Sequence, residues 1–212
     1  MSGAPAQRSP EWIALRKNVI TGTDVAAILG TSRFDTVDDI LYKKLGVEKR
    51  FSQKSRESMA HGVKYEDEAR QVYERVMSEK VHEVGLCPHE TIPWLAASPD
   101  GVTETGKLIE IKCPTGDFRS EIPSYYIPQV QLCMEVLNVH VCDYIEYKPG
   151  FPLKIQSIPR DREWFNKAYP ILEAFWNRVQ ERKKLPLCEI QEDEGNENCE
   201  DDECDWIPDG EE

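Results

Sequence analysis

Apolar residues recur at helical spacing through the first part of the chain, where residues that commonly begin or end helices interrupt them. Ser9 followed by Pro10 and Glu11 is typical of a helix start, with the serine as the N-cap. Either Thr21 or Thr23 can cap the next helix, and a glycine ends each of the second and third helices. The pattern predicts four helices, over residues 10–17, 21–30, 36–45 and about 55–79.

The remaining part of the chain mixes strands and helices. Strand-like runs dominate from Val81 to Cys113, and prolines and the turn Pro99-Asp100-Gly101 break them. The pattern then predicts a helix at 128–137, strands at 141–147 and 153–158, and a helix at 160–184. Pro170 lies inside the last helix and should kink it or restart it. This order of elements predicts one α/β domain, with a mixed central sheet flanked by helices.

The net charge of −13 comes from the end of the chain. From Glu189 onward there are thirteen Asp or Glu and no Lys or Arg, whereas the rest of the chain has 26 residues of each sign. A segment so rich in like charge cannot bury enough apolar surface to fold. We therefore expect a flexible N-terminus over residues 1–8, a folded domain over 9–188 and a disordered acidic tail over 189–212.

The acidic tail has two interpretations. It can be a plain solubilising appendage. Alternatively, Trp206 and Ile207 among the acids can dock on a basic partner or on a basic groove of the same protein.

Cysteine usage and hydropathy bear on location. The seven cysteines are an odd number without paired or metal-ligand spacing, which favours free thiols in a reducing compartment. The start of the chain lacks the pattern of a secretion signal, and no apolar run approaches the roughly 20 residues that span a bilayer. We expect a protein of the cytoplasm or nucleus that is not secreted and does not enter a membrane.

Glu66 occupies an unusual place in the long helix expected at 55–79. It falls within an apolar stripe at helical spacing. A carboxylate on a buried helix face is costly unless it is paired or bound to a metal. The stripe consists of Met59, Gly62, Val63, Ala69, Tyr73 and Val76.

The segment around Glu110 carries a chemical signal. In a strand, Glu110 and Lys112 project from one face, whereas Ile109, Ile111 and Cys113 project from the other. Taken alone, this pair can also be an ordinary ion pair on a sheet face.

Asp100 lies upstream in a turn between two expected strands. A hairpin of that length can bring Asp100 beside Glu110, where two carboxylates repel each other unless a cation bridges them. Hard oxygen ligands of this kind suit Mg²⁺ or Mn²⁺. Taken alone, Asp100 can equally be a turn former before Gly101.

Together, Pro99-Asp100 and Glu110-Ile111-Lys112 match the signature of the PD-(D/E)xK nucleases. The chain resembles the λ-exonuclease/YqaJ branch of that superfamily in four motifs, which occur in the same order between about Ser9 and Tyr147. The resemblance implies a restriction-endonuclease-like α/β fold. The motifs are Leu15-Arg16 with Val19-Ile20-Thr21-Gly22-Thr23-Asp24, His61-Gly62-Val63-Lys64-Tyr65-Glu66-Asp67-Glu68-Ala69-Arg70, Ser98-Pro99-Asp100-Gly101 with Glu110-Ile111-Lys112-Cys113-Pro114, and Pro128-Gln129-Val130-Gln131-Leu132.

The resemblance also implies roles at a catalytic centre. Asp100, Glu110 and the backbone carbonyl of Ile111 would bind one or two Mg²⁺ ions, for which Mn²⁺ can substitute. Glu66 would add a further carboxylate. Lys112 would orient the attacking water and help to deprotonate it.

Four more residues match positions with implied roles. Gln131 would hydrogen-bond the surroundings of the nucleophile, and it lies on an apolar stripe where a polar side chain needs a partner. Arg16, Thr23 and Ser98 would bind the 5′-phosphate of the strand being digested. From the residues alone, Thr23 can equally be a helix cap and Arg16 a surface charge.

The resemblance implies a Mg²⁺-dependent exonuclease that digests double-stranded DNA 5′ to 3′ from a 5′-phosphorylated end, in recombination or viral DNA processing. It further implies a single-strand annealing protein as a partner, and some relatives close into a homotrimeric ring. The stretch from Lys43 to Arg56 has six basic residues and is the candidate phosphate track. Two alternatives stay open: an endonuclease or DNA/RNA nuclease with the same site, and a non-catalytic DNA- or protein-binding module.

Overall fold

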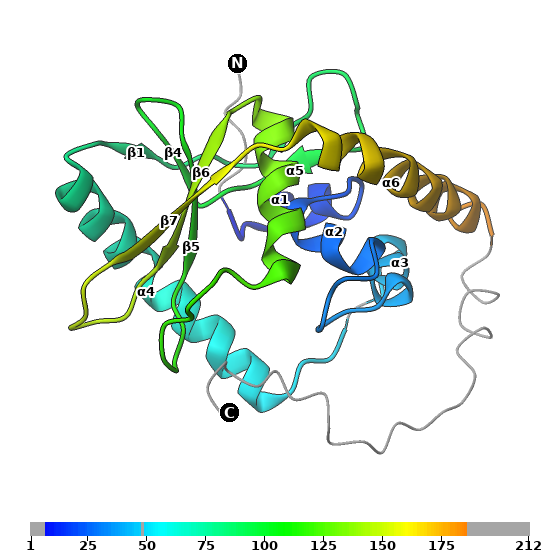
Figure 1. Cartoon of the computed structure of the whole chain (residues 1–212). Coiled ribbons are helices and arrows are strands. Elements are labelled where there is room, and N and C mark those ends of the chain that lie inside the picture. Colours follow the sequence, from blue (N-terminus) through cyan, green and yellow to red (C-terminus); the bar gives the residue numbers. More distant parts are fainter. Residues whose placement is uncertain (1–6, 48, 186–212) are drawn as a thin grey trace.

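A five-stranded sheet crosses the middle of the protein in the strand order β1-β4-β5-β6-β7 (Figure 1). The computed structural model describes residues 7–47 and 49–185. Within this sheet β5 and β6 are parallel, and every other neighbouring pair is antiparallel. A separate pair of short antiparallel strands, β2 and β3, lies outside it. The strands are β1 (Val81–His82), β2 (Cys87–Pro88), β3 (Ala96–Ala97), β4 (Gly101–Thr103), β5 (Leu108–Lys112), β6 (Val141–Glu146) and β7 (Lys154–Pro159).

Helices cover both faces of the sheet and divide the core into two parts. Helix α4 lies against one face, and the other helices lie on the opposite side (Figure 1). Because side chains alternate along β5, Leu108 joins the larger core with α5, whereas Ile109 and Ile111 join the smaller core with α4. The helices are α1 (Pro10–Arg16), α2 (Gly22–Ile28), α3 (Val37–Leu45), α4 (Gln53–Met77), the 3₁₀ turn η1 (Ser124–Tyr126), α5 (Ile127–Leu137) and α6 (Arg162–Arg182).

The expected α/β architecture is confirmed, and several helix ends follow the residues that predicted them. Ser9 caps α1 by accepting a hydrogen bond from the backbone N–H of Trp12. Thr21, and not Thr23, is the N-cap of α2. Helix α3 ends at Gly46, whose φ of 96° lies in the left-handed region that glycine adopts without strain.

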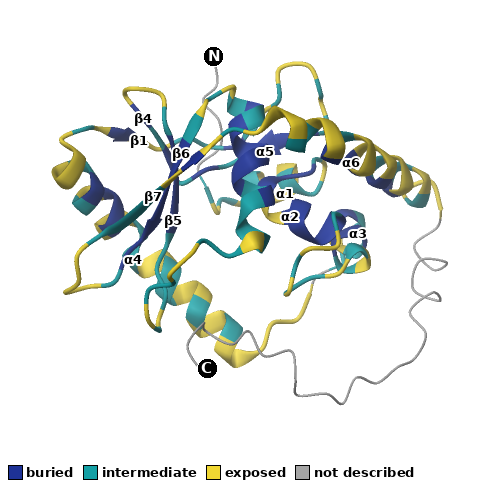
Figure 2. Cartoon of the chain, viewed as in Figure 1, coloured by how far each residue is buried: buried dark blue, intermediate teal, exposed yellow. Residues whose placement is uncertain are grey.

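The apolar stripe expected along α4 is only partly buried. Ala69 and Tyr73 are fully buried against the sheet, but Met59, Val63 and Val76 are exposed. The first half of α4 extends past the edge of the sheet (Figures 1 and 2), so Met59 and Val63 have no sheet to pack against. This does not account for Val76, which lies at the end of the second half. Spacing alone identifies a helix face without showing how far along the helix a partner extends.

Three further expectations concern the last helix and the chain ends. Helix α6 continues through Pro170 without restarting. Residues 7 and 8, from the segment expected to be flexible, make hydrogen bonds to the domain. Residues 1–6 and the acidic tail over 189–212 lie outside the described residues. No described helix is long and apolar enough to cross a membrane.

Candidate active site

Glu110 and Lys112 project from the same face of β5, as the alternation of the strand predicts. The Lys112 ammonium donates a hydrogen bond of 2.6 Å to Oε1 of Glu110. The Glu110 side chain is almost fully buried, and it also accepts a 2.5 Å hydrogen bond from Nε2 of Gln129 on α5. A carboxylate is thus held in the interior between an ammonium and an amide.

Asp100 reaches this pair because β4 and β5 form a tight hairpin. Its Oδ2 accepts a 2.7 Å hydrogen bond from the backbone N–H of Ile111, midway between Glu110 and Lys112. The next residue, Gly101, packs so closely on β1 that a Cβ there would overlap Cγ1 of Val81. The glycine therefore serves this close approach, which sets β4 and its preceding aspartate in place.

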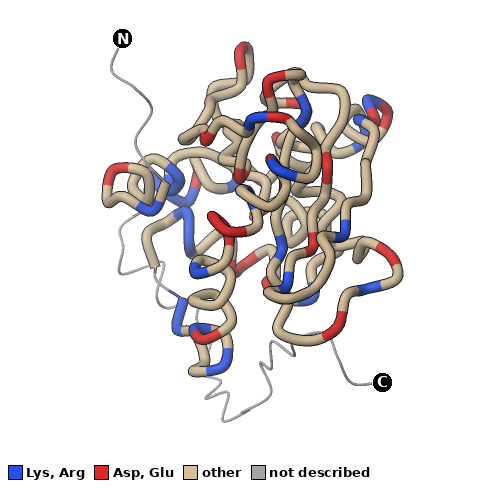
Figure 3. Tube along the Cα trace, turned by 90° about the vertical axis from the view of Figure 1, so that its left-hand side faces the viewer, with Lys and Arg blue, Asp and Glu red and all other residues tan. Residues whose placement is uncertain are grey.

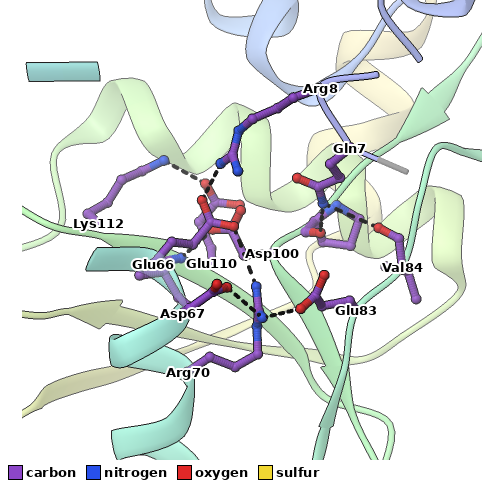
Figure 4. A network of polar contacts seen from close by, with 12 residues as sticks. Gln7, Arg8, Glu66, Asp67, Arg70, Glu83, Val84, Asp100, Glu110 and Lys112 are labelled. Atoms are coloured by element: carbon purple, nitrogen blue, oxygen red, sulfur yellow. Dashed lines mark hydrogen bonds and ion pairs between the residues drawn. The ribbon is translucent and has the colours of Figure 1, made fainter. Parts of the chain in front are cut away.

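Glu66 brings a third carboxylate to the same place from α4. Figure 4 shows the side chains of Glu66, Asp100 and Glu110 pointing toward one another, with Lys112 and Arg8 approaching from different directions. Oε2 of Glu66 lies 2.5 Å from Nη2 of Arg8, and Oε1 lies 3.5 Å from Nη2 of Arg70. The predicted set of Glu66, Asp100, Glu110 and Lys112, hereafter the acidic cluster, is therefore assembled in space.

Burial and mutual repulsion act on the carboxylates of the acidic cluster. Burial, followed by the charges of Glu110 and Glu66, raises the pKa of Asp100 to about 8, although Lys112 acts in the opposite direction. Burial alone would lower the pKa of Lys112, but Glu110 outweighs it and raises that pKa above its ordinary value. These surroundings favour the charged form of Lys112 and disfavour the charged form of Asp100.

Gln131 does not lie at the acidic cluster. Its amide donates to the carbonyl of Pro159 at 2.9 Å and accepts from the N–H of Asp161 at 2.8 Å, so it joins α5 to the start of α6. The residue beside Glu110 is Gln129, which the sequence analysis did not select. Two positions on a helix lie about 200° apart, so only one of the two glutamines can face β5.

Arg16, Thr23 and Ser98 come together as expected, with Trp12 connecting them. Nη2 of Arg16 donates to Oγ1 of Thr23 at 2.8 Å, and Nε1 of Trp12 donates to Oγ of Ser98 at 3.0 Å. The Arg16 guanidinium also lies 4.3 Å from the centre of the Trp12 ring. Thr23 is exposed and does not cap α2, so its hydroxyl can donate to a ligand while it accepts the hydrogen bond from Arg16.

A buried ion pair fixes the backbone beneath Arg16. Lys44 donates to Oδ2 of Asp24 at 2.6 Å and to the carbonyl oxygen of Arg16 at 2.9 Å, and both charged side chains are fully buried. Lys43 donates to the other oxygen of Asp24 at 2.8 Å. Two cations of the expected phosphate track therefore serve Asp24, a correction to that prediction.

Lys49 and Arg50 of the basic stretch line a cavity of about 510 Å³ that reaches Lys112 and Gln129. Both signs of charge are interspersed over the described domain (Figure 3). An edge-to-face pair of Phe34 and Tyr125, with ring centres 5.2 Å apart, lies in its wall. The cationic lining residues are Arg33, Lys49, Arg50 and Lys112.

The model of the YqaJ-like viral recombinase domain matches residues 11–140, which is more than half of the chain. The chain belongs to the YqaJ-like viral recombinase family. The matched segment contains all four sequence motifs and the whole acidic cluster.

The YqaJ-like domain resembles two viral proteins. It is 30% identical to an uncharacterised protein of Acanthamoeba polyphaga mimivirus over 166 residues, covering 67% of this chain and 29% of that protein. It is 26% identical to a protein of African swine fever virus over 160 residues, covering 60% of this chain and 45% of that protein. The chain thus spans less than half the length of these relatives.

Two solved structures share its fold. The alkaline exonuclease LHK-Exo from Laribacter hongkongensis matches with a TM-score of 0.70 and 26% identity, over 83% of this chain and 95% of that one. A phage-related exonuclease from Haemophilus somnus 129PT matches with a TM-score of 0.58 and 14% identity, over 80% of this chain and 96% of that one. The chain is therefore a YqaJ-like domain with a restriction-endonuclease-like fold, similar to the fold of LHK-Exo.

The donor chemistry of the YqaJ-like domain fits a divalent cation. Among the described residues, no group of three or more His, Cys, Asp or Glu side chains is placed so that it could hold a metal ion without rearrangement. The raised pKa of Asp100, caused by burial and by Glu110 and Glu66, nevertheless marks a charge deficit that a cation would relieve. Asp100 and Glu110 would supply oxygen ligands with the carbonyl of Ile111, and Glu66 would first have to exchange its arginine contacts.

Proposed function

We propose that this YqaJ-like domain is a Mg²⁺-dependent exonuclease that digests double-stranded DNA 5′ to 3′ from a 5′-phosphorylated end. The observation that carries the proposal is the meeting of three carboxylates, Glu66, Asp100 and Glu110, beside the ammonium of Lys112. Mg²⁺ bound there would lower the pKa of a coordinated water and neutralise charge on the phosphate. Mn²⁺ would substitute, and one or two ions would bind.

Lys112 would orient the attacking water and stabilise charge that develops on the phosphate. The ammonium is positioned by Glu110 and by the ring of Tyr126, whose centre lies 4.7 Å away. The carboxylate of Glu110 raises the pKa of Lys112, which favours the charged ammonium and suits electrostatic stabilisation. Lys112 would also help to deprotonate the water, as the family resemblance implies. Gln129 would keep the Glu110 carboxylate in place by its hydrogen bond.

Recognition of a DNA end would fall to Arg16, Thr23 and Ser98. A guanidinium pairs with phosphate oxygens through two parallel hydrogen bonds, and the hydroxyl of Thr23 can add a third contact. Ser98 lies two residues before Asp100, so a terminal phosphate bound here would lie close to the acidic cluster. A site that holds a terminal phosphate next to the cutting centre favours an exonuclease over an endonuclease.

The wider role proposed is DNA recombination or viral DNA processing beside a single-strand annealing protein, with three copies of the chain closing around DNA. The family description as a viral recombinase and the viral relatives support this role. LHK-Exo is an alkaline exonuclease, which supports cleavage from an end.

The direct test compares linear duplexes carrying a labelled 5′-phosphate or a 5′-hydroxyl end with a closed circular duplex in Mg²⁺. We expect release of mononucleotides from the phosphorylated end, at least about tenfold slower release from the hydroxyl end, and an intact circle. Cleavage of the circle would favour the endonuclease alternative. Equal rates on both linear ends would remove Arg16, Thr23 and Ser98 from end recognition.

A further inference from the structure

Arg8 extends into the acidic cluster from the start of the described chain. Its Nη2 lies 2.5 Å from Oε2 of Glu66, and its side chain is 49% exposed. We propose that Arg8 is a further substrate-binding residue, whose guanidinium binds a phosphate of the DNA strand at the catalytic centre. This inference rests on the proposed nuclease function.

The backbone on both sides of Arg8 is anchored. The Gln7 side chain donates to the carbonyl oxygen of Val84 at 3.2 Å and to that of Pro99 at 2.9 Å (Figure 4). Pro99 immediately precedes Asp100 in the chain. Ser9, on the other side, is the N-cap of α1. Arg8 therefore stays beside the acidic cluster when its side chain changes partner, and only that side chain has to move.

The conformation of Arg8 also points to function. Its φ of 66° lies in the left-handed region, which costs conformational energy for any residue other than glycine. A glycine would fit this turn without that cost, so what arginine adds here is its side chain. Such strain in a residue that touches a catalytic cluster is a reason to look for a role in binding.

Charge defines the ligand that Arg8 suits. A phosphodiester that approaches Glu66, Asp100 and Glu110 meets three carboxylates, and Lys112 is already paired with Glu110. The guanidinium of Arg8 offers several donors in a fork that matches phosphate oxygens. When Arg8 leaves, Glu66 keeps Arg70 as a second cationic partner. A divalent ion bound at the acidic cluster would also weaken the attraction between Glu66 and Arg8. The guanidinium is then released to the substrate.

The experiment uses Arg8→Gly, which fits the left-handed backbone and removes the whole side chain with its guanidinium, and Arg8→Lys, which keeps a charge without the fork. Binding of a 5′-phosphorylated duplex is measured by fluorescence anisotropy over a range of salt, with Ca²⁺ in place of Mg²⁺ to hold the complex uncut. We expect Arg8→Gly to weaken binding about tenfold and to reduce the slope of log affinity against log salt by about 0.9, the loss of one phosphate contact. Arg8→Lys should keep the slope and lose part of the affinity.

The control is Arg178→Gln, because Arg178 makes one ion pair with Asp38 and is 46% exposed, close to the exposure of Arg8. It should retain both the affinity and the slope. Calorimetric titration of Mg²⁺ into Arg8→Gly should show an affinity at least equal to that of the wild type, since a competing cation has left Glu66.

Three results would overturn the inference. An unchanged salt slope with weaker Mg²⁺ binding would make Arg8 a support for Glu66 and nothing more. If Arg8→Gly binds DNA as tightly as the wild type, and the wild type cuts DNA, Arg8 does not bind the substrate but the proposed function stands. A wild-type protein that neither binds nor cuts DNA would reject both.

Discussion

Replacing Lys112 with alanine should slow DNA cleavage at least about 100-fold while the protein still folds and binds DNA. The ammonium is the cation that contacts Glu110 directly, and its protonated state makes it the side chain best placed to stabilise charge at the reacting phosphate. Removing it leaves the oxygen ligands intact, so metal and DNA binding should survive. Single-turnover rates on a labelled duplex, with binding measured separately, would separate the chemical step from affinity.

Lys154→Ala provides the matched control for that substitution. Lys154 is 26% exposed and pairs with the buried Glu146 at 3.2 Å, much as Lys112 is 25% exposed and pairs with the buried Glu110. Both substitutions leave a buried glutamate without its lysine, so both should lower stability to a similar degree. Only Lys112→Ala should lower the cleavage rate, and a wild-type rate in that variant would remove Lys112 from the mechanism.

Asp24→Asn should destabilise the domain by about 3–5 kcal/mol, because it leaves the buried ammonium of Lys44 without a full counter-charge. Urea unfolding at neutral pH measures this loss. Asp35→Asn is the comparison, since Asp35 pairs with the partly exposed Lys49 and such pairs contribute about 0–1 kcal/mol. A loss below about 1 kcal/mol for Asp24→Asn would show that the buried pair matters little.

The same pair gives a dependence on pH with a definite sign. Burial alone would raise the pKa of Asp24, but Lys44, Lys43 and Arg16 lower it well below its ordinary value. The stability from the Asp24 charge is therefore fully present above the ordinary carboxyl pKa near 4, and it is lost as pH falls toward the lowered value. The stability difference between wild type and Asp24→Asn should shrink correspondingly in acid.

Because Lys44 also holds the carbonyl of Arg16, Asp24→Asn should lose part of the preference for a 5′-phosphate over a 5′-hydroxyl end.

The positions of the acidic cluster were predictable where local geometry decides them. Strand alternation places Glu110 and Lys112 on one face, and a short hairpin brings Asp100 to them. Gln129 and Gln131 could not be separated in this way, because the rotation of α5 about its axis is set by how it packs on the sheet and not by its own sequence.

Contacts between residues far apart in the chain could not be predicted from the sequence. Arg8 lies 58 positions from Glu66, and no periodic pattern connects them. Lys43 and Lys44 looked like free cations in a basic stretch until the fold brought Asp24 between them. The exposure of the first half of α4 could not be predicted either, because an apolar stripe does not reveal where the sheet that packs against it ends.

The most direct test of the central claim is calorimetric titration of Mg²⁺ into the wild type and into Asp100→Asn. The wild type should bind, with affinity that increases as pH rises toward about 8, because the ion must displace the proton that burial and the neighbouring carboxylates keep on Asp100. Asp100→Asn should lose this binding. Equal binding by both proteins, or binding by neither, would contradict the assignment of Glu66, Asp100, Glu110 and Lys112 as a metal-dependent catalytic centre.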